Sequence, residues 1–252
     1  AIFSRSPGGL KRTGIFVGGR DAKLAVEMVR LAHKSMVPPF EVSVFADPSG
    51  AFTTAAAMVA AVERELEEKF HTDLNGKVVL ALGGTGPVGQ IAATLAAQAG
   101  AKVTIIGRQL EKAQAIANLC NSEFGDGQTN IEGNADANKS ELMQNADVVF
   151  ATAAAGVQVL SADLVAAAPL LKVAADVNAV PPSGIAGLEA HFSGLPISGS
   201  HSGAVGVGAL AIGNIKYKTQ SELLKHMRSS EAKVYLSFED AFEVARGFAK
   251  PA

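Results

Sequence analysis

The stretch that decides the fold is Val78–Gly89, which reads Val-Val-Leu-Ala-Leu-Gly-Gly-Thr-Gly-Pro-Val-Gly. Its apolar half predicts a buried strand, its glycines predict a sharp turn, and the alanine-rich segment Gln90–Gly100 predicts a helix. Gly84 allows the turn, Gly86 lets the backbone approach a pyrophosphate, and Gly89 lets the helix pack against the strand. A lone G-x-G-x-x-G is weak evidence, and a purely structural turn is the alternative. Between a strand and a helix whose first N–H groups attract phosphate, the motif predicts dinucleotide binding.

The end of the next predicted strand, Ala101–Ile106, indicates which dinucleotide is bound. An NAD-preferring site normally has an aspartate or glutamate there for the ribose 2′-hydroxyl, whereas this chain has Gly107 and Arg108. The guanidinium group of Arg108 can bind a 2′-phosphate through two hydrogen bonds, and Lys112, one helical turn later, supplies a second cation. NADP is therefore favoured over NAD. The alternative is that Arg108 is a solvated residue after a strand.

The composition excludes several classes of protein. The chain has 252 residues, of which 48% are hydrophobic, and a formal charge of −2. It has no basic run typical of nucleic-acid binding and no apolar stretch long enough to span a bilayer, so a soluble cytoplasmic enzyme is expected. The single cysteine, Cys120, excludes an internal disulfide, and the five histidines lack ligand spacing, so no metal site is predicted.

Before the glycine motif, the apolar periodicity predicts two strand–helix units and hence a parallel sheet. The expected strands are Thr13–Gly19 and Phe40–Ala46, and the expected helices are Asp21–Ser35 and Thr53–Phe70. A polar joint at His71–Gly76 separates this first domain from the dinucleotide-binding domain.

Beyond Arg108, the alternation of helices and strands continues. The expected elements are a helix to about Phe124, a strand near Thr129–Ile131, a helix at Ser140–Asn145, a strand at Ala146–Thr152, a helix at Ala162–Ala167 and a strand at Leu170–Ala175. Helices at Asn214–Arg228 and Phe238–Phe248 are expected to return to the first domain. The fold class is therefore α/β, with two parallel-sheet domains, the second of Rossmann type.

Polar residues follow the last of these strands. Because ligands of open parallel sheets bind outside the carboxyl ends of the strands, Asp176 and Asn178 are expected near the reactive end of the cofactor. The alternative is an Asx-turn that closes the strand before the two prolines Pro181 and Pro182. The glycines of Gly203–Gly213 predict a segment that can run close to a ligand or to another backbone.

Four further stretches are distinctive: Arg12–Gly19, Phe45–Thr54, Asp176–Pro182 and Gly206–Lys216. Together with the glycine motif, and over nearly the whole chain, they resemble the NAD(P)-dependent methylene-tetrahydromethanopterin dehydrogenases of methylotrophic bacteria. These enzymes are close kin of the methylene-tetrahydrofolate dehydrogenases. The resemblance implies transfer of hydride from the methylene bridge of a reduced pterin to the nicotinamide, which gives the methenyl form in one-carbon metabolism.

The resemblance also implies how the chain is divided. Residues 1–73 are expected to form the pterin domain, residues 74–213 the NADP-binding Rossmann domain, and residues 214–252 the C-terminal helices that pack on the first domain. Family members carry another strand and helix before the position of Ala1, so the first domain is expected to lack its N-terminal segment. The resemblance also implies a homo-oligomer, with the pterin between the two domains.

Lys216 matches a lysine that the family places near the reacting centre. It is expected to hydrogen-bond a pterin carbonyl or tail, or to be neutralised by an aspartate such as Asp47; the alternative is a helix-surface lysine. The predicted catalytic residues are Lys216, Asp47 and Asp176. The predicted substrate-binding residues are Asp47, Thr53, Asp176, Asn178 and Lys216. The predicted cofactor-binding residues are Gly84, Thr85, Gly86, Pro87, Val88, Gly89, Arg108, Lys112, Thr152, Ala153 and Asn178.

Several alternatives stay open at this point. Gly107-Arg108 is similar to the NADP-preferring branch of the family, whereas Asp47–Gly50 and Asp176–Pro182 are similar to a branch that also accepts NAD. Folate could replace methanopterin as the substrate. Another NADP-dependent dehydrogenase, resembling shikimate dehydrogenase, would need a lysine–aspartate pair to move a hydroxyl proton. A non-catalytic dinucleotide sensor would keep the glycine motif but need no polar site.

Overall fold

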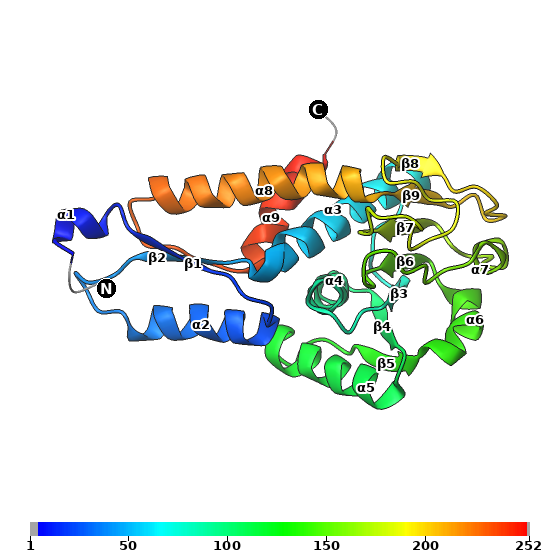
Figure 1. The fold of residues 1–252 in the computed structure, drawn as a ribbon, viewed down its shortest axis with the longest axis horizontal. Coiled ribbons are helices and arrows are strands. Elements are labelled where there is room, and N and C mark those ends of the chain that lie inside the picture. The colour runs from blue at the N-terminus through cyan, green and yellow to red at the C-terminus, as the bar shows by residue number, and fades with distance from the viewer. Residues whose placement is uncertain (1–4, 251–252) are drawn as a thin grey trace.

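The computed structural model describes residues 5–250, and the segment expected before Ala1 lies outside that range. The chain forms two sheets that lie at opposite ends of an elongated molecule, joined by long helices (Figure 1). This arrangement confirms the predicted α/β class with two parallel-sheet domains.

The first sheet has the strand order β1-β2-β10, and all three strands are parallel. Its strands are β1 (Gly14–Val17), β2 (Ser43–Ala46) and β10 (Tyr235–Leu236). Helix α2 (Ala22–Ser35) connects β1 to β2 and begins at Asp21, whose side chain accepts a hydrogen bond from the Leu24 N–H at 3.0 Å. In Figure 1, β1 and β2 lie between α2 and the long helix α8 (Ala209–Ser229). A short helix, α1 (Pro7–Leu10), precedes β1.

The second sheet has the order β5-β4-β3-β6-β7-β9-β8 and is parallel except for the edge strand β8. Its strands are β3 (Val78–Leu82), β4 (Lys102–Gly107), β5 (Glu132–Ala135), β6 (Val148–Ala151), β7 (Val173–Asp176), β8 (Ser193–Pro196) and β9 (Val205–Val207). After β3 the chain adds β4 and then β5 on one side of the sheet, whereas after β6 it adds β7, β9 and β8 on the other side. The carboxyl ends of β3 and β6 are therefore the switch point at which doubly wound sheets bind ligands.

Helices cover both faces of this second sheet. The helices between its strands are α4 (Pro87–Gln98), α5 (Leu110–Leu119), α6 (Lys139–Leu142) and α7 (Ala162–Ala166), and a π-helical turn at Cys120–Phe124 extends α5. Helix α4 faces the first domain, whereas α6 and α7 lie on the opposite side of the sheet (Figure 1).

Helix α3 (Ala51–Phe70) joins the two domains, because it begins after β2 and packs against α4, β7, α8 and α9 (Phe238–Ala249). Its alanines are buried, as are Phe52, Met58 and Leu66, none of which exposes any surface. Small side chains let the helices approach closely, and this buried helix fixes the distance between the domains. Within the described residues, no helix combines the length and the apolar character that a bilayer crossing requires.

Three details of the fold differ from the sequence-based expectation. The prediction of a strand near Thr129–Ile131 is wrong. The Asn121 side chain accepts hydrogen bonds from the Thr129 hydroxyl at 2.9 Å and from the Ile131 N–H at 2.8 Å. These bonds hold that stretch against the π-helical turn, and β5 begins only at Glu132. Helix α8 begins at Ala209, earlier than expected. Strands β8 and β10 were not predicted.

Candidate active site

The glycine turn lies at the carboxyl end of β3, as the motif predicts. The Gly83 N–H donates to the Ile106 carbonyl of β4 at 3.0 Å, and a Cβ on Gly84 would lie 2.6 Å from the Ala81 carbonyl oxygen. A Cβ on Gly89 would overlap the Gly84 Cα and lie 2.6 Å from Thr152 Oγ1. Both positions therefore require glycine for packing.

Gly86 is different, because a Cβ built on it would meet no atom within 4 Å. It precedes α4, whose first turn contains Pro87, so the next N–H groups, those of Val88 and Gly89, have no acceptor within the helix. Open space, a helix N-terminus and a residue without a side chain suit a pyrophosphate. The turn therefore fits a dinucleotide.

The residues that follow β6 pack beside the glycine turn. The Thr152 hydroxyl donates to the Leu82 carbonyl at 3.2 Å and so ties the end of β6 to the end of β3. Ala153 packs against Gly83, where an added Cβ would lie 2.7 Å from the Ala153 Cα. Both residues therefore lie beside the glycine turn, and their contact with the cofactor stays a prediction.

Arg108 follows the carboxyl end of β4, next to the glycine turn. A Cβ on Gly107 would lie 2.9 Å from Thr85 Cγ2, which shows how closely the two segments meet. Arg108 and Lys112 are exposed, and neither takes part in an ion pair among residues 5–250. Both charges are therefore free to meet an anion such as a 2′-phosphate.

In the first domain, Asp47 follows β2 and is 2% exposed. Its Oδ1 accepts from the N–H groups of Phe52 and Thr53 at 3.0 and 3.2 Å, and its Oδ2 accepts from the Thr53 hydroxyl at 2.7 Å and from Gln220 Nε2 at 2.8 Å. A carboxylate at the first turn of α3 is favoured by the helix dipole. The structure brings Asp47 and Thr53 together, but both are buried, so here they hold the loop after β2 in place.

Lys216 of α8 lies over this same loop. A Cβ on Gly50 would lie 2.9 Å from Lys216 Nζ, and Gly50 has a φ of +69° that favours glycine. Ser49, with a φ of 52°, donates its hydroxyl to the Gly19 carbonyl at 2.7 Å and so joins this loop to the one after β1. An ion pair between Lys216 and Asp47, one of the two alternatives predicted for this lysine, is not formed. Four donors already occupy the Asp47 carboxylate.

Asp176 and Asn178 lie at the carboxyl end of β7, and their side chains bond the loop that follows. Asp176 Oδ1 accepts from the Asn178 N–H at 2.9 Å, an Asx-turn, while its Oδ2 accepts from the Gly184 N–H at 2.7 Å. Asn178 Oδ1 accepts from the N–H groups of Gly156 and Val180 at 3.2 and 2.9 Å. Burial raises the pKa of the Asp176 carboxyl, although the N–H groups of Asn178, Gly184 and Ile185, which bond this carboxylate, oppose that shift. Direct contact of either residue with a substrate stays a prediction.

Gln220 of α8, which donates to Asp47, was not among the residues predicted from the sequence. Its position four residues after Lys216 puts both side chains on one face of the helix, and this spacing is the signal that could have identified it. The link fixes the loop after β2 relative to the helix that carries Lys216.

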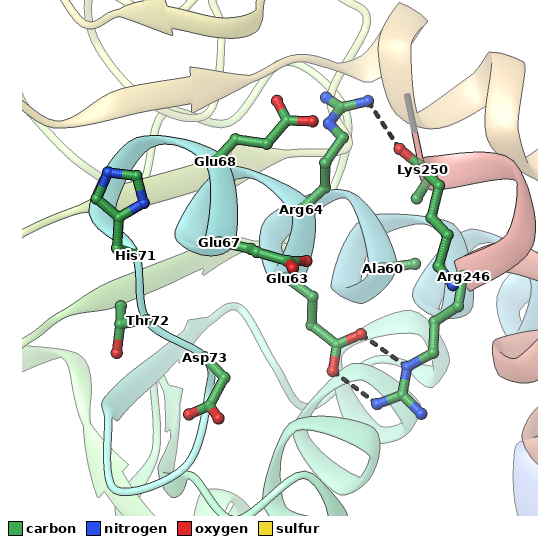
Figure 2. Close-up of a pocket in the computed structure, with 11 residues that line it drawn as sticks. Ala60, Glu63, Arg64, Glu67, Glu68, His71, Thr72, Asp73, Arg246 and Lys250 are labelled. Atoms are coloured by element: carbon green, nitrogen blue, oxygen red, sulfur yellow. Dashed lines mark hydrogen bonds and ion pairs between the residues drawn. The ribbon is translucent and has the colours of Figure 1, made fainter. Parts of the chain in front are cut away.

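A surface cavity of about 890 Å³ lies apart from all these residues, between the C-terminal half of α3 and the end of α9 (Figure 2). It is lined by Ala60, Glu63, Arg64, Glu67, Glu68, His71, Thr72, Asp73, Arg246, Ala249 and Lys250. Glu63 binds Arg246 through two hydrogen bonds at 2.6 and 2.7 Å, and the buried carboxylate of Glu65 binds Arg64. Two of its cations are thus already neutralised, and no predicted site residue lines it.

A Rossmann sheet with an open glycine turn, beside a second parallel-sheet domain that presents a lysine, defines the class of two-domain nicotinamide-dependent dehydrogenases. Comparison with known proteins narrows this class. Residues 1–49 match the model for the N-terminal part of methylene-tetrahydromethanopterin dehydrogenase, and residues 65–181 match that for shikimate/quinate 5-dehydrogenase.

Individual relatives agree with the first of these models. The chain is 43% identical, over 246 residues, to the NAD(P)-dependent methylenetetrahydromethanopterin dehydrogenase of Methylorubrum extorquens, covering 97% of this chain and 82% of that protein. It is 36% identical to the bifunctional protein MdtA of the same organism, covering 96% and 79% of the two chains. The chain therefore belongs to the NAD(P)-dependent methylenetetrahydromethanopterin dehydrogenase family. Among solved structures, quinate dehydrogenase of Corynebacterium glutamicum in complex with NAD has a TM-score of 0.46 at 16% identity, covering 76% of this chain and 61% of that one.

Proposed function

We propose that the protein is an oxidoreductase that transfers hydride from methylene-tetrahydromethanopterin to NADP and releases methenyl-tetrahydromethanopterin, a step of one-carbon metabolism. The observation that carries this proposal is the 43% identity to an NAD(P)-dependent methylenetetrahydromethanopterin dehydrogenase over 97% of the chain. The open glycine turn and the unpaired Arg108 support a nicotinamide dinucleotide as cofactor.

NADP is proposed to lie along the carboxyl edge of the second sheet. Its pyrophosphate would meet the turn from Gly84 to Gly89, where the space in front of Gly86 is free, and its 2′-phosphate would meet Arg108 and Lys112. Thr152 and Ala153 would form the wall beside the turn. NAD would use the same turn without the 2′-phosphate contacts, so it is expected to be the weaker cofactor.

The pterin is proposed to lie between the domains, with residues 1–73 and the returning residues 214–252 on one side and residues 74–213 on the other. Lys216 would hydrogen-bond a carbonyl or the tail of the pterin. Asp47 and Thr53 would act by holding the loop below Lys216, and Asp176 with Asn178 would shape the opposite wall.

The main task of the protein in this reaction is to position the pterin and the nicotinamide. The carbon that loses hydride is flanked by two nitrogens, whose lone pairs stabilise the resulting cation, so no side chain has to remove a proton. When bound, the nicotinamide supplies the hydride acceptor. The protein's part is to align the two reactants and to exclude water, and alignment alone can supply much of the rate.

The test is reduction of NADP by the purified protein, followed by NADPH absorbance, with methylene-tetrahydromethanopterin and, separately, methylene-tetrahydrofolate. Turnover with the methanopterin substrate and less with the folate substrate is expected. A faster reaction with folate would reassign the substrate, and no reduction with either, in protein that binds NADP, would refute the proposed activity.

The assembly and location are proposed from the same relationship. A homo-oligomer in the cytoplasm is expected, as for an enzyme that draws on a diffusible nicotinamide pool. Sedimentation velocity of the purified protein and fractionation of the source cells would test these two statements.

A further inference from the structure

Gln90, the residue that follows the last glycine of the motif, holds the turn from its far side. Its Nε2 donates to the Thr85 carbonyl at 2.9 Å. Its own backbone is anchored as well, because its N–H donates to the Gly86 carbonyl at 2.9 Å and its carbonyl accepts from the Thr94 hydroxyl at 2.9 Å. The side chain therefore reaches the turn from a fixed position on the first turn of α4.

The bond from Gln90 fixes the orientation of one peptide unit. The Thr85 carbonyl and the Gly86 N–H belong to the same trans peptide group, so they point in opposite directions. With the carbonyl held toward Gln90, the Gly86 N–H has to point away from α4. No hydrogen-bond acceptor for this N–H is found in the described part of the chain.

The space in front of Gly86 is open, since a Cβ placed there would meet nothing within 4 Å. If the Thr85–Gly86 peptide turned over, its carbonyl oxygen would replace the N–H at the turn. A carbonyl oxygen repels a phosphate oxygen, whereas an N–H binds it. The direction of this one peptide group thus decides whether the turn presents a donor or an acceptor to an anion.

We propose that Gln90 is a positioning residue for the cofactor: its side chain locks the Thr85–Gly86 peptide so that the Gly86 N–H is presented to the pyrophosphate of the dinucleotide. The inference rests on the proposed function, because it assumes that a nicotinamide dinucleotide occupies the turn. Gln90 itself does not touch the cofactor and acts only through the peptide.

The contribution of Gln90 differs from that of Arg108 in a measurable way. The pyrophosphate is common to NADP and NAD, so losing the lock should weaken both by the same factor. A side chain that binds the 2′-phosphate affects NADP alone. Once the cofactor is bound at saturation the peptide is held by the cofactor as well, so turnover at saturating cofactor should change little.

The test compares Gln90→Met, which keeps the length of the side chain but has no donor, with wild type. Dissociation constants for NADP and NAD are measured by titration calorimetry, and KM and kcat by steady-state kinetics. Loss of one oriented hydrogen bond is expected to raise both dissociation constants and both KM values about tenfold, with kcat and the unfolding temperature close to wild type.

Gln98→Met is the matched control, because Gln98 lies on the same helix and donates to the Phe124 carbonyl at 3.5 Å, away from the turn. It should leave cofactor binding unchanged. Gln90→Ala is the second variant and should weaken binding at least as much as Gln90→Met. Wild-type affinity in both Gln90 variants, or a loss confined to NADP, would overturn the proposal. Wild-type protein that binds neither dinucleotide would instead refute the proposed function.

Discussion

Gly86 and Gly89 lie in the same motif, but replacing each by valine is expected to have a different effect, on cofactor binding at Gly86 and on stability at Gly89. In Gly86→Val the new side chain lies in open space, because a Cβ at this position meets no atom within 4 Å. In Gly89→Val the new side chain overlaps atoms of Gly84 and Thr152. The first variant should therefore fold and lose its cofactor. The second should be impaired in folding itself.

The magnitudes follow from these surroundings. Overpacking at Gly89 costs about 1–3 kcal/mol, and in a chain of this size each kcal/mol lowers the unfolding temperature by about 2–4 °C. Gly89→Val should thus unfold roughly 2–12 °C below wild type. Gly86 is the N-cap residue of α4 and provides no side-chain hydrogen bond to the helix, so valine there should cost no more than about 1 kcal/mol.

Thermal unfolding followed by circular dichroism, with and without NADP, separates the two effects. At about 100 times its dissociation constant, NADP should stabilise wild type by about 2.7 kcal/mol, and it should stabilise Gly86→Val by nothing measurable. If NADP raises the unfolding temperature of Gly86→Val as much as that of wild type, Gly86 does not contact the cofactor. If Gly89→Val is as stable as Gly86→Val, the overlap expected at Gly89 is wrong.

Three further predictions concern single side chains. Arg108→Ala should raise KM for NADP tenfold or more and leave KM for NAD unchanged, because a charge-assisted hydrogen bond contributes about 1.5–3 kcal/mol; equal shifts for both cofactors in steady-state kinetics would contradict this role. Lys216→Ala should lower kcat about tenfold or more while the calorimetric affinity for NADP stays the same, since Lys216 Nζ lies over Gly50 in the first domain. Normal turnover with both pterins would make it a surface lysine. Burial raises the pKa of Cys120 to about 12, so its thiol should resist iodoacetamide at about pH 8 until the protein unfolds, which mass spectrometry can follow. Rapid alkylation of the folded protein would contradict its burial.

Most of the second domain could be predicted because its signals are local. The run Val78–Gly89 contains a strand, a turn and a helix start within twelve residues, and each follows from neighbouring residue types. Strand β10 could not be predicted in this way, because Tyr235 and Leu236 are a strand only through pairing with Val44 and Phe45. Strand β8 contains Gly194 and Pro196 and an irregular register, so it lacks strand periodicity.

The sequence located the polar residues of the candidate site more reliably than it described their partners. Strand ends placed Asp47 and Asp176 at the carboxyl edges of the two sheets, where the structure has them. The Asx-turn between Asp176 and the Asn178 N–H was one of the two predicted alternatives. The bonds from Gly184 to Asp176 and from Phe52 to Asp47 could not be predicted, because they depend on how each loop folds back. Gln220 was missed because its partner lies 173 residues away in the chain, although its spacing from Lys216 was a local signal for it.

Because β10 pairs with β2, the first sheet is completed by a segment that follows every strand of the second sheet in the sequence. β1 and β2 precede β3 in the sequence, but the strand that pairs with the other edge of β2 is Tyr235–Leu236, which follows β9. Strands β3 to β9 lie in one continuous segment, so their sheet can close while the C-terminal helices are still being translated. Domains usually fold in the order in which they emerge. In this protein the second sheet is therefore expected to form first, and the first sheet is expected to be completed only after Tyr235–Leu236 has been synthesised.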